Sequence, residues 1–283
     1  MLDAQLAVAE NMRKAFPDAT RIGPASWSFV YQNGRAHSSR AWLEGNTFVL
    51  TSSPLSLRGS PQSMVAKNVT LPAASRITLT RDGLELRTEV VLWPDAETSS
   101  VCEGTLDEFR MALDVLGGKS APAAEIPPTS CMPFEQEPAP HWNARKNEDG
   151  TWTISLPHGR AAALHASPTL VVAKLLDQRE SPQEVRAAVA EFLLRSTSEI
   201  RFVKACATSD RDTDWAAWIQ ASPATCGGMD EALTATAFAY GECAAEVRAL
   251  SEVRLARRCQ EVASIWRAKV ASIPKEKEVK KNV

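Results

Sequence analysis

The pentapeptide Asp210–Asp214 has the spacing of a calcium-binding loop. It reads Asp-Arg-Asp-Thr-Asp, and carboxylates at alternate positions suit a Ca²⁺ ion. A complete loop also has Gly at its sixth position and Glu at its twelfth. This sequence has Trp215 and Ala221 there. A hydrated turn between two strands is therefore the simpler interpretation.

Cysteine and histidine residues are present, but not at the spacings that usually hold a metal ion. None of the six cysteines forms a Cys-x-x-Cys pair, and no two of the four histidines lie four residues apart. We therefore predict no metal site and no cofactor. Cys226 is the best candidate nucleophile, because it precedes Gly227-Gly228 and an expected helix whose N-terminus would lower the pKa of the thiol. A loop residue without function is the simpler alternative.

Composition argues against several classes of partner. The chain has 32 basic and 34 acidic residues and a formal charge of −2, so we predict no binding to nucleic acid or to an anionic membrane surface. Gly227-Gly228 lacks the Lys and Ser of a phosphate-binding loop. No stretch reaches the roughly 20 apolar residues of a membrane span, and the first residues lack the basic start of a signal peptide. A cytoplasmic location is the expectation.

Four tryptophans are candidates for a protein-binding surface, since aromatic side chains often line peptide-binding faces. They are Trp27, Trp42, Trp215 and Trp218. Packing in a core is the alternative interpretation of each. Trp215 and Trp218 are three residues apart in an expected strand, so they point to opposite faces unless a bulge lies between them.

The elements that would position these residues are predicted twice. Hydrophobic periodicity and turn signals predict, in the first half, a helix over 2–16, strands over 26–32, 39–44 and 47–52, a helix over 60–69, a hairpin of 76–80 with 84–93, and a helix over 105–116. In the second half they predict strands over 151–156, 160–166 and 170–176, a helix over 181–195, a hairpin of 200–208 with 215–221, and a helix over 229–270.

Short segments also recur between the halves. Leu50–Pro54 is similar to Leu164–Pro168, Ser60–Gln62 to Ser181–Gln183, and Ser75–Leu79 to Ser198–Phe202. We therefore predict an α+β protein of two tandem modules, each a twisted antiparallel sheet packed by helices, with a long C-terminal helix. The predicted domains are 1–118, a proline-rich linker over 119–140, a second module over 141–273 and a disordered charged tail over 274–283.

The first hairpin alternates clearly. Leu84, Leu86, Thr88, Val90 and Leu92 share one face, whereas Glu85, Arg87 and Glu89 share the other. This pattern is typical of an antiparallel sheet with one face in water.

The order of elements resembles the type III secretion chaperone-like superfamily, which includes the class I effector chaperones and related small bacterial proteins. The segments that carry the resemblance are Ala190–Arg195, Ile200–Val203, Trp215–Ile219, Met229–Leu233 and Cys243–Val247, with weaker support from Ile77–Leu79 and Gly83–Leu92. The resemblance implies a non-enzymatic protein that binds an extended segment of another polypeptide on a sheet face or edge. Family chaperones are shorter and act as homodimers, whereas this chain carries two copies.

The leading hypothesis is a chaperone-like or adaptor protein, without enzymatic activity, that binds another polypeptide. Its two modules would pair within one chain, giving a monomer with an internal pseudo-dimer rather than an obligate homodimer. One alternative is a structural or regulatory module that assembles through the helix over 229–270. Another is a cysteine-dependent enzyme with Cys226 as its nucleophile.

Overall fold

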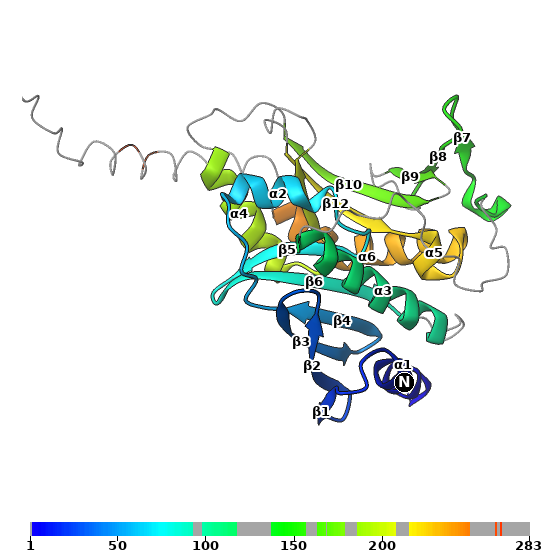
Figure 1. The fold of residues 1–283 in the computed structure, drawn as a ribbon. Coiled ribbons are helices and arrows are strands. Elements are labelled where there is room, and N and C mark those ends of the chain that lie inside the picture. Colours follow the sequence, from blue (N-terminus) through cyan, green and yellow to red (C-terminus); the bar gives the residue numbers. More distant parts are fainter. Residues whose placement is uncertain are drawn as a thin grey trace, which may run out of the picture.

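The computed structural model describes residues 2–92, 98–117, 137–156, 163–167, 169–178, 186–207 and 215–249, together with positions 264 and 267. Over these residues the chain is an α+β protein with two six-stranded antiparallel sheets and several helices (Figure 1). The predicted fold class is confirmed at this level. The predicted tail, the Asp210–Asp214 turn and most of the linker lie outside the described residues.

The first half contains α1 (Leu2–Ala15), β1 (Thr20–Gly23), β2 (Ser26–Gln32), β3 (Ala36–Glu44), β4 (Thr47–Ser52), α2 (Pro61–Asn68), β5 (Ser75–Thr80), β6 (Gly83–Val91) and α3 (Thr98–Leu116). The second half contains η1 (Pro140–Trp142), β7 (Arg145–Lys146), β8 (Trp152–Ser155), β9 (Ala163–Ser167), β10 (Leu170–Gln178), α4 (Arg186–Glu199), β11 (Lys204–Ala207), β12 (Trp215–Ala221), α5 (Pro223–Cys226) and α6 (Met229–Ala249). The predicted continuation of the last helix to position 270 lies mostly outside the described residues.

Both sheets arrange their strands in the same way. The orders are β1-β2-β3-β4-β6-β5 and β7-β8-β9-β10-β12-β11, so four successive strands are followed by the sixth and then the fifth. The strand registers also correspond, because Trp27 of β2 lies opposite Ala41 and Trp152 of β8 lies opposite Ala166. The topology is therefore duplicated.

Two of the three repeated segments nevertheless occupy different places in the two halves. Leu50–Pro54 begins in β4, the fourth strand of its sheet, and ends just after it, whereas Leu164 lies in β9, the third strand of the other. Ser75–Leu79 forms β5, but Ser198–Phe202 ends α4 and forms the turn before β11. Those alignments are wrong, because a few matching residues weigh less than the strand register that each hairpin imposes.

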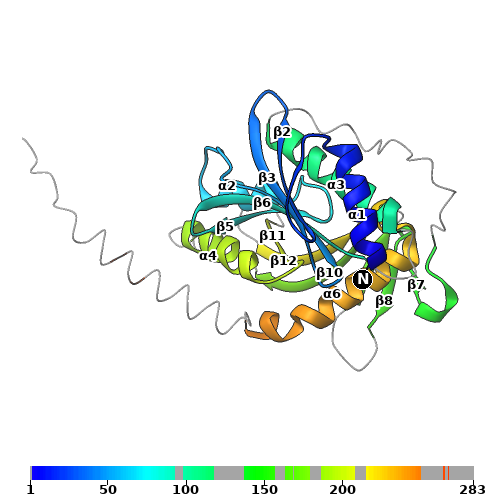
Figure 2. The same ribbon diagram turned by 90° about the horizontal axis from the view of Figure 1, so that it is seen from below.

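Helices pack on the apolar face of each sheet. On the first sheet α1 and α3 lie side by side (Figure 2), and the Phe29 ring lies 4.1 Å from that of Phe16 and 6.1 Å from that of Phe109, centroid to centroid. On the second sheet α6 packs over β10 and β12. The helix α2 begins as predicted, because Ser60 accepts a hydrogen bond from the Ser63 amide and Pro61 occupies the first turn.

Two further helices join the halves. The helix α2 packs against α4, α2 also contacts β11, and α4 also contacts β5 (Figure 1). Each half therefore places a helix against the inner edge strand of the other half. The two contacts have the reciprocal form of an isologous interface.

The charged face of the first hairpin is buried at this contact. Arg76 is 2 % exposed and Glu89 is 4 % exposed, because α4 and the turn that follows it lie over β5 and β6. The prediction of a solvated face is therefore wrong here. The alternation of polar and apolar residues along a strand shows that one face is polar. It does not show whether that face contacts water or the polar groups of a second module.

Candidate functional site

Glu89 is the centre of a buried charge cluster between the two halves. Its Oε2 accepts hydrogen bonds from Arg76 Nη2 at 2.8 Å and from the backbone N–H of Phe202 at 2.8 Å, and its Oε1 accepts one from Arg87 Nε. Arg76 also donates to the carbonyl of Ile200. One carboxylate from the first sheet thus fixes the turn that precedes β11.

The electrostatics of the cluster follow from its burial and its two cations. Burial alone would raise the pKa of Glu89, but Arg76, Arg87 and the Phe202 amide outweigh it and lower the pKa to about 2. Burial lowers the pKa of Arg76, against the opposing effect of Glu89. Burial raises the pKa of Glu85, which Arg87 and Arg76 partly oppose. Glu89 therefore carries its charge throughout the physiological pH range.

Lys204 makes the reciprocal contact from the second half. Its Nζ donates to the carbonyls of Leu71 at 3.3 Å and Pro72 at 2.8 Å, in the turn before β5. The side chain is fully buried, and burial lowers its pKa to about 8 against the opposing effects of Cys206 and Glu108. Arg76 of β5 thus donates to a carbonyl in the turn before β11, and Lys204 of β11 donates to carbonyls in the turn before β5.

Asn68, at the end of α2, joins the inner edges of both sheets. Its Nδ2 donates to the carbonyl of Ile77 at 3.1 Å and to that of Ala205 at 2.9 Å. Its Oδ1 accepts from the Ile77 N–H at 2.6 Å. The amide therefore satisfies both backbone groups of Ile77, as a neighbouring strand would.

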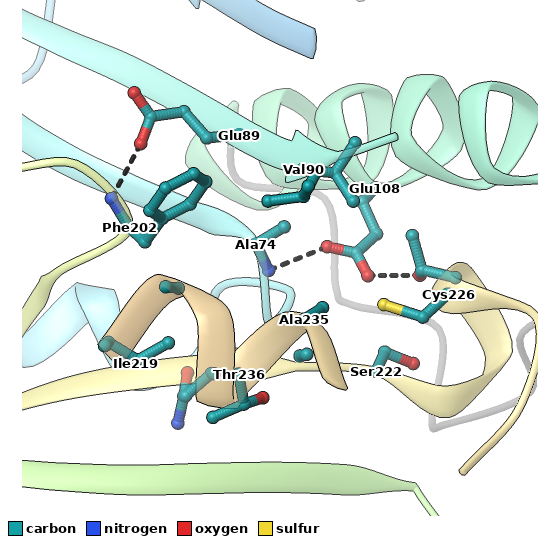
Figure 3. A pocket seen from close by; sticks show the side chains of 15 residues that line it. Ala74, Glu89, Val90, Glu108, Phe202, Ile219, Ser222, Cys226, Ala235 and Thr236 are labelled. Carbon is teal, nitrogen blue, oxygen red and sulfur yellow. Dashed lines mark hydrogen bonds between the residues drawn. The ribbon is translucent and has the colours of Figure 1, made fainter. Parts of the chain in front are cut away.

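A small cavity lies behind the cluster, between β6, α3, β12 and α6 (Figure 3). Its volume is about 30 Å³, which admits one or two water molecules. Glu108 projects into it and accepts hydrogen bonds from the Ala74 amide at 2.9 Å and from the Thr225 hydroxyl. Burial raises the pKa of Glu108, against those two hydrogen bonds and Lys204. The space is too small for a metabolite.

Cys226 also lines this cavity (Figure 3). It ends the four-residue helix α5 and does not begin α6. Burial, with smaller effects of Glu108 and Glu231, raises the pKa of its thiol to about 12. The prediction of a lowered thiol pKa is wrong, and almost no thiolate forms at neutral pH.

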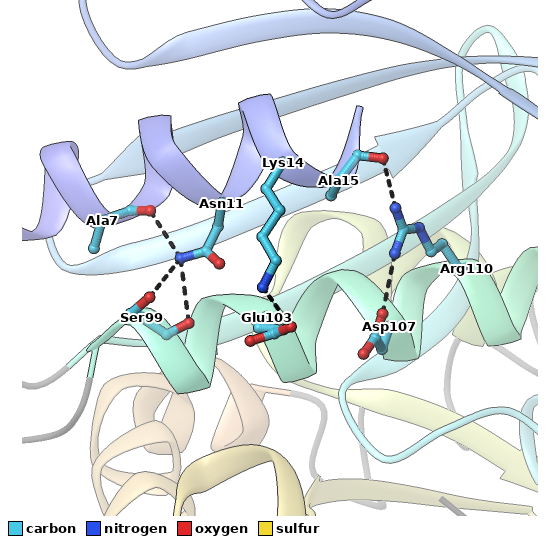
Figure 4. Close-up of polar contacts among 8 residues, drawn as sticks. All are labelled: Ala7, Asn11, Lys14, Ala15, Ser99, Glu103, Asp107 and Arg110. Atoms are coloured by element: carbon cyan, nitrogen blue, oxygen red, sulfur yellow. Dashed lines mark hydrogen bonds and ion pairs between the residues drawn. The ribbon is translucent and has the colours of Figure 1, made fainter. Parts of the chain in front are cut away.

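A second crevice, of about 130 Å³, separates α1 from α3. Its charged groups are engaged with each other, as Figure 4 shows. Lys14 pairs with Glu103 at 3.1 Å, and Arg110 contacts both Asp107 at 3.1 Å and the Ala15 carbonyl at 2.6 Å. Asn11 Nδ2 donates to the carbonyls of Ala7 and Ser99 and to the Ser99 hydroxyl. These contacts hold the two helices together and leave little for a ligand to bind.

The four tryptophans proposed for a binding surface do not share one environment. Trp27 is 5 % exposed and belongs to the core. Trp42 points to the other face of the same sheet, because it lies opposite Ser26 and Val49 whereas Trp27 lies opposite Ala41. Trp218 is partly exposed, and its Nε1 is buried without a hydrogen-bond partner among the described residues. The side chain of Trp215 lies outside the described structure.

Trp42 belongs to a partly exposed surface at the outer end of the first sheet. Ile22 and Val30 are 55 % and 54 % exposed there, and Arg40 is exposed beside them. The guanidinium of Arg87 lies 5.9 Å from the centroid of the Trp42 ring. We call the surface formed by Ile22, Val30, Arg40 and Trp42 the β1–β3 face; Arg87 of β6 borders it.

Sequence reasoning missed most of these residues. Asn68, Arg76 and Lys204 are polar residues in or beside predicted elements, and only their burial distinguishes them. A usable signal was the unusual density of charge on one short hairpin, where Arg76, Glu85, Arg87 and Glu89 all fall on one face. A face with this many charged side chains can contact either water or the charged surface of a second module.

Comparison with protein-family models, with curated proteins and with solved structures finds no match for this chain. Over the described ranges, no helix has both the length and the apolar run needed to cross a membrane. Within the same ranges, no three His, Cys, Asp or Glu side chains gather as a metal site.

Proposed function

We propose that the protein is a non-enzymatic, chaperone-like scaffold that binds an extended segment of another polypeptide. Its two modules form an internal pair, so one chain supplies what two subunits supply in a dimer. The support is the shared strand order of the sheets, the reciprocal packing of α2 and α4, and the cross-contacts of Glu89, Asn68 and Lys204.

One observation carries the choice of binding region. The inner edges of both sheets are engaged, since Asn68 bonds the backbone of β5 and of β11. The outer strand β1 lacks a neighbour on its far side in the described structure, and the surface beside it exposes Ile22 and Val30. Exposed apolar side chains on a sheet face beside an open edge form a surface on which an extended segment of another polypeptide can lie.

Site-specific photo-cross-linking tests the proposal. A photoreactive phenylalanine analogue replaces Val30 in the full chain, which is expressed in the cells from which the sequence comes. A matched variant carries the same analogue at Glu148, exposed in the turn after β7. We expect a covalent adduct with a second polypeptide at position 30, identified by mass spectrometry, and none at position 148. Equal adducts at both positions, or none at position 30, would contradict the proposal.

A further inference from the structure

In the described part of the chain, the β1–β3 face has Arg40 as an exposed cation. Arg40 lies opposite Ser28 of β2 and Thr51 of β4. No described carboxylate forms an ion pair with it, whereas Arg76 and Arg87 share Glu89 and the Arg201 guanidinium pairs with Glu44. The charge of Arg40 is therefore available to a ligand.

Apolar side chains lie near that charge, one same-face position beyond its direct cross-strand neighbours Ser28 and Thr51. Val30 and Arg40 lie on the same face of neighbouring strands, since Val30 pairs with Ser38 and Ser28 pairs with Arg40. Trp42 is two residues beyond Arg40 on β3, so it shares this face and is partly exposed. A basic centre with an apolar border matches a ligand that combines carboxylates with apolar groups.

The strand ladder also sets the spacing of the site. Arg40, Thr51 and Arg87 are directly opposite one another on β3, β4 and β6. The two arginines are therefore roughly 10 Å apart across the strands. Because Arg87 already pairs with Glu89 and its side chain is 17 % exposed, Arg40 is the basic group of this surface that a carboxylate of the bound segment can reach.

We infer that the β1–β3 face binds an extended polypeptide segment in which acidic side chains alternate with apolar ones. This inference rests on the proposed function and adds the chemistry of the bound segment. A carboxylate forms a two-pronged hydrogen-bonded pair with the Arg40 guanidinium, while apolar residues cover Val30 and Ile22. A segment with lysine at the acidic positions meets repulsion from Arg40.

Fluorescence anisotropy with two labelled decapeptides tests this inference. One peptide alternates glutamate with valine, and the other has lysine in place of each glutamate. With the full chain we expect the acidic peptide to bind at least tenfold more tightly than the basic one, and its affinity to fall with added salt. Arg40→Gln should weaken the acidic peptide at least fivefold. The matched variant Arg145→Gln, at an exposed arginine on the second sheet, should leave its affinity unchanged.

Equal binding of the two peptides, no binding of the acidic peptide, or equal effects of Arg40→Gln and Arg145→Gln would overturn the inference. If one of these results is obtained but cross-linking at position 30 succeeds, the proposed function stands and only the preference for acidic segments is refuted. If cross-linking fails as well, both are refuted. Because Arg40 is exposed, urea unfolding of the Arg40→Gln variant should match the wild type, which separates lost binding from lost folding.

Discussion

Replacing Glu89 with glutamine removes one buried charge while keeping the shape of the side chain. Two buried or half-buried guanidinium groups, those of Arg76 and Arg87, then lack their counter-charge. The amide can still accept a hydrogen bond from the Phe202 N–H, which lies 2.8 Å from the carboxylate. The substitution therefore tests the charge itself rather than the packing.

The pKa of Glu89 sets the size of the effect. Folding lowers that pKa from 4.5 to about 2, a difference that corresponds to about 3 kcal/mol of stability. Breaking a buried ion pair by removing one partner costs a similar 3–5 kcal/mol or so in other proteins. We expect Glu89→Gln to lower the free energy of unfolding by about 3 kcal/mol at pH 7.

Urea unfolding across pH distinguishes this mechanism from a packing defect. A carboxyl group whose folded pKa is depressed stabilises the fold above its unfolded pKa and loses that contribution as the pH falls toward its folded pKa. The difference between wild type and Glu89→Gln should be full at pH 7, shrink below pH 4.5 and approach zero near pH 2. Glu191→Gln is the control, because its pair with Arg195 is exposed and contributes less than about 1 kcal/mol. A Glu89→Gln variant within 1 kcal/mol of wild type at pH 7, or a difference independent of pH, would refute the reasoning.

Three further predictions concern the same interface. Asn68→Ala should destabilise the protein by about 2–4 kcal/mol, because buried backbone groups of Ile77 and Ala205 lose their partner; denaturant unfolding checks this, and a loss below 1 kcal/mol would argue against a bridging role. Lys204→Met should flatten the stability profile between pH 8 and 10.5, where the wild type gains up to about 3 kcal/mol as the buried ammonium deprotonates; a profile that still rises by that amount would exclude Lys204 as the source. The thiol of Cys226 should react with a maleimide only at the rate of global unfolding, as it is buried and its pKa is about 12; fast labelling under native conditions, compared with the Cys226→Ala variant, would contradict this.

Much of the fold follows from local patterns in the sequence. Alternation over Leu84–Leu92 and the turn at Gly83 predict the β5–β6 hairpin, and Ser60-Pro61 predicts the start of α2. Both signals are local, because each depends on residues that are neighbours along the chain. The strands β1 and β7 have four and two residues. They are too short for an alternation of polar and apolar residues to be recognised.

The candidate site could not be predicted in the same way. The contacts of Glu89 with Phe202 and of Asn68 with Ala205 join residues more than 100 positions apart. Both depend on how one module docks on the other, and the polarity of each residue alone is equally consistent with a solvated surface. The tryptophans give a second example of this limit. Trp27 and Trp42 are the same residue type in neighbouring predicted strands, but they point to opposite faces of one sheet.

The shared carboxylate of Glu89 has a consequence for synthesis of the chain. Phe202 is made 113 residues after Glu89, a delay of roughly 6–23 s at ordinary rates of translation. During this interval α4 and the turn after it are incomplete, so the charged face of the nascent first sheet is not yet covered. We expect the growing polypeptide to be most vulnerable to proteases and to non-native association in this window, and a ribosome-stalled fragment ending before α4 to be cleaved faster than the finished protein.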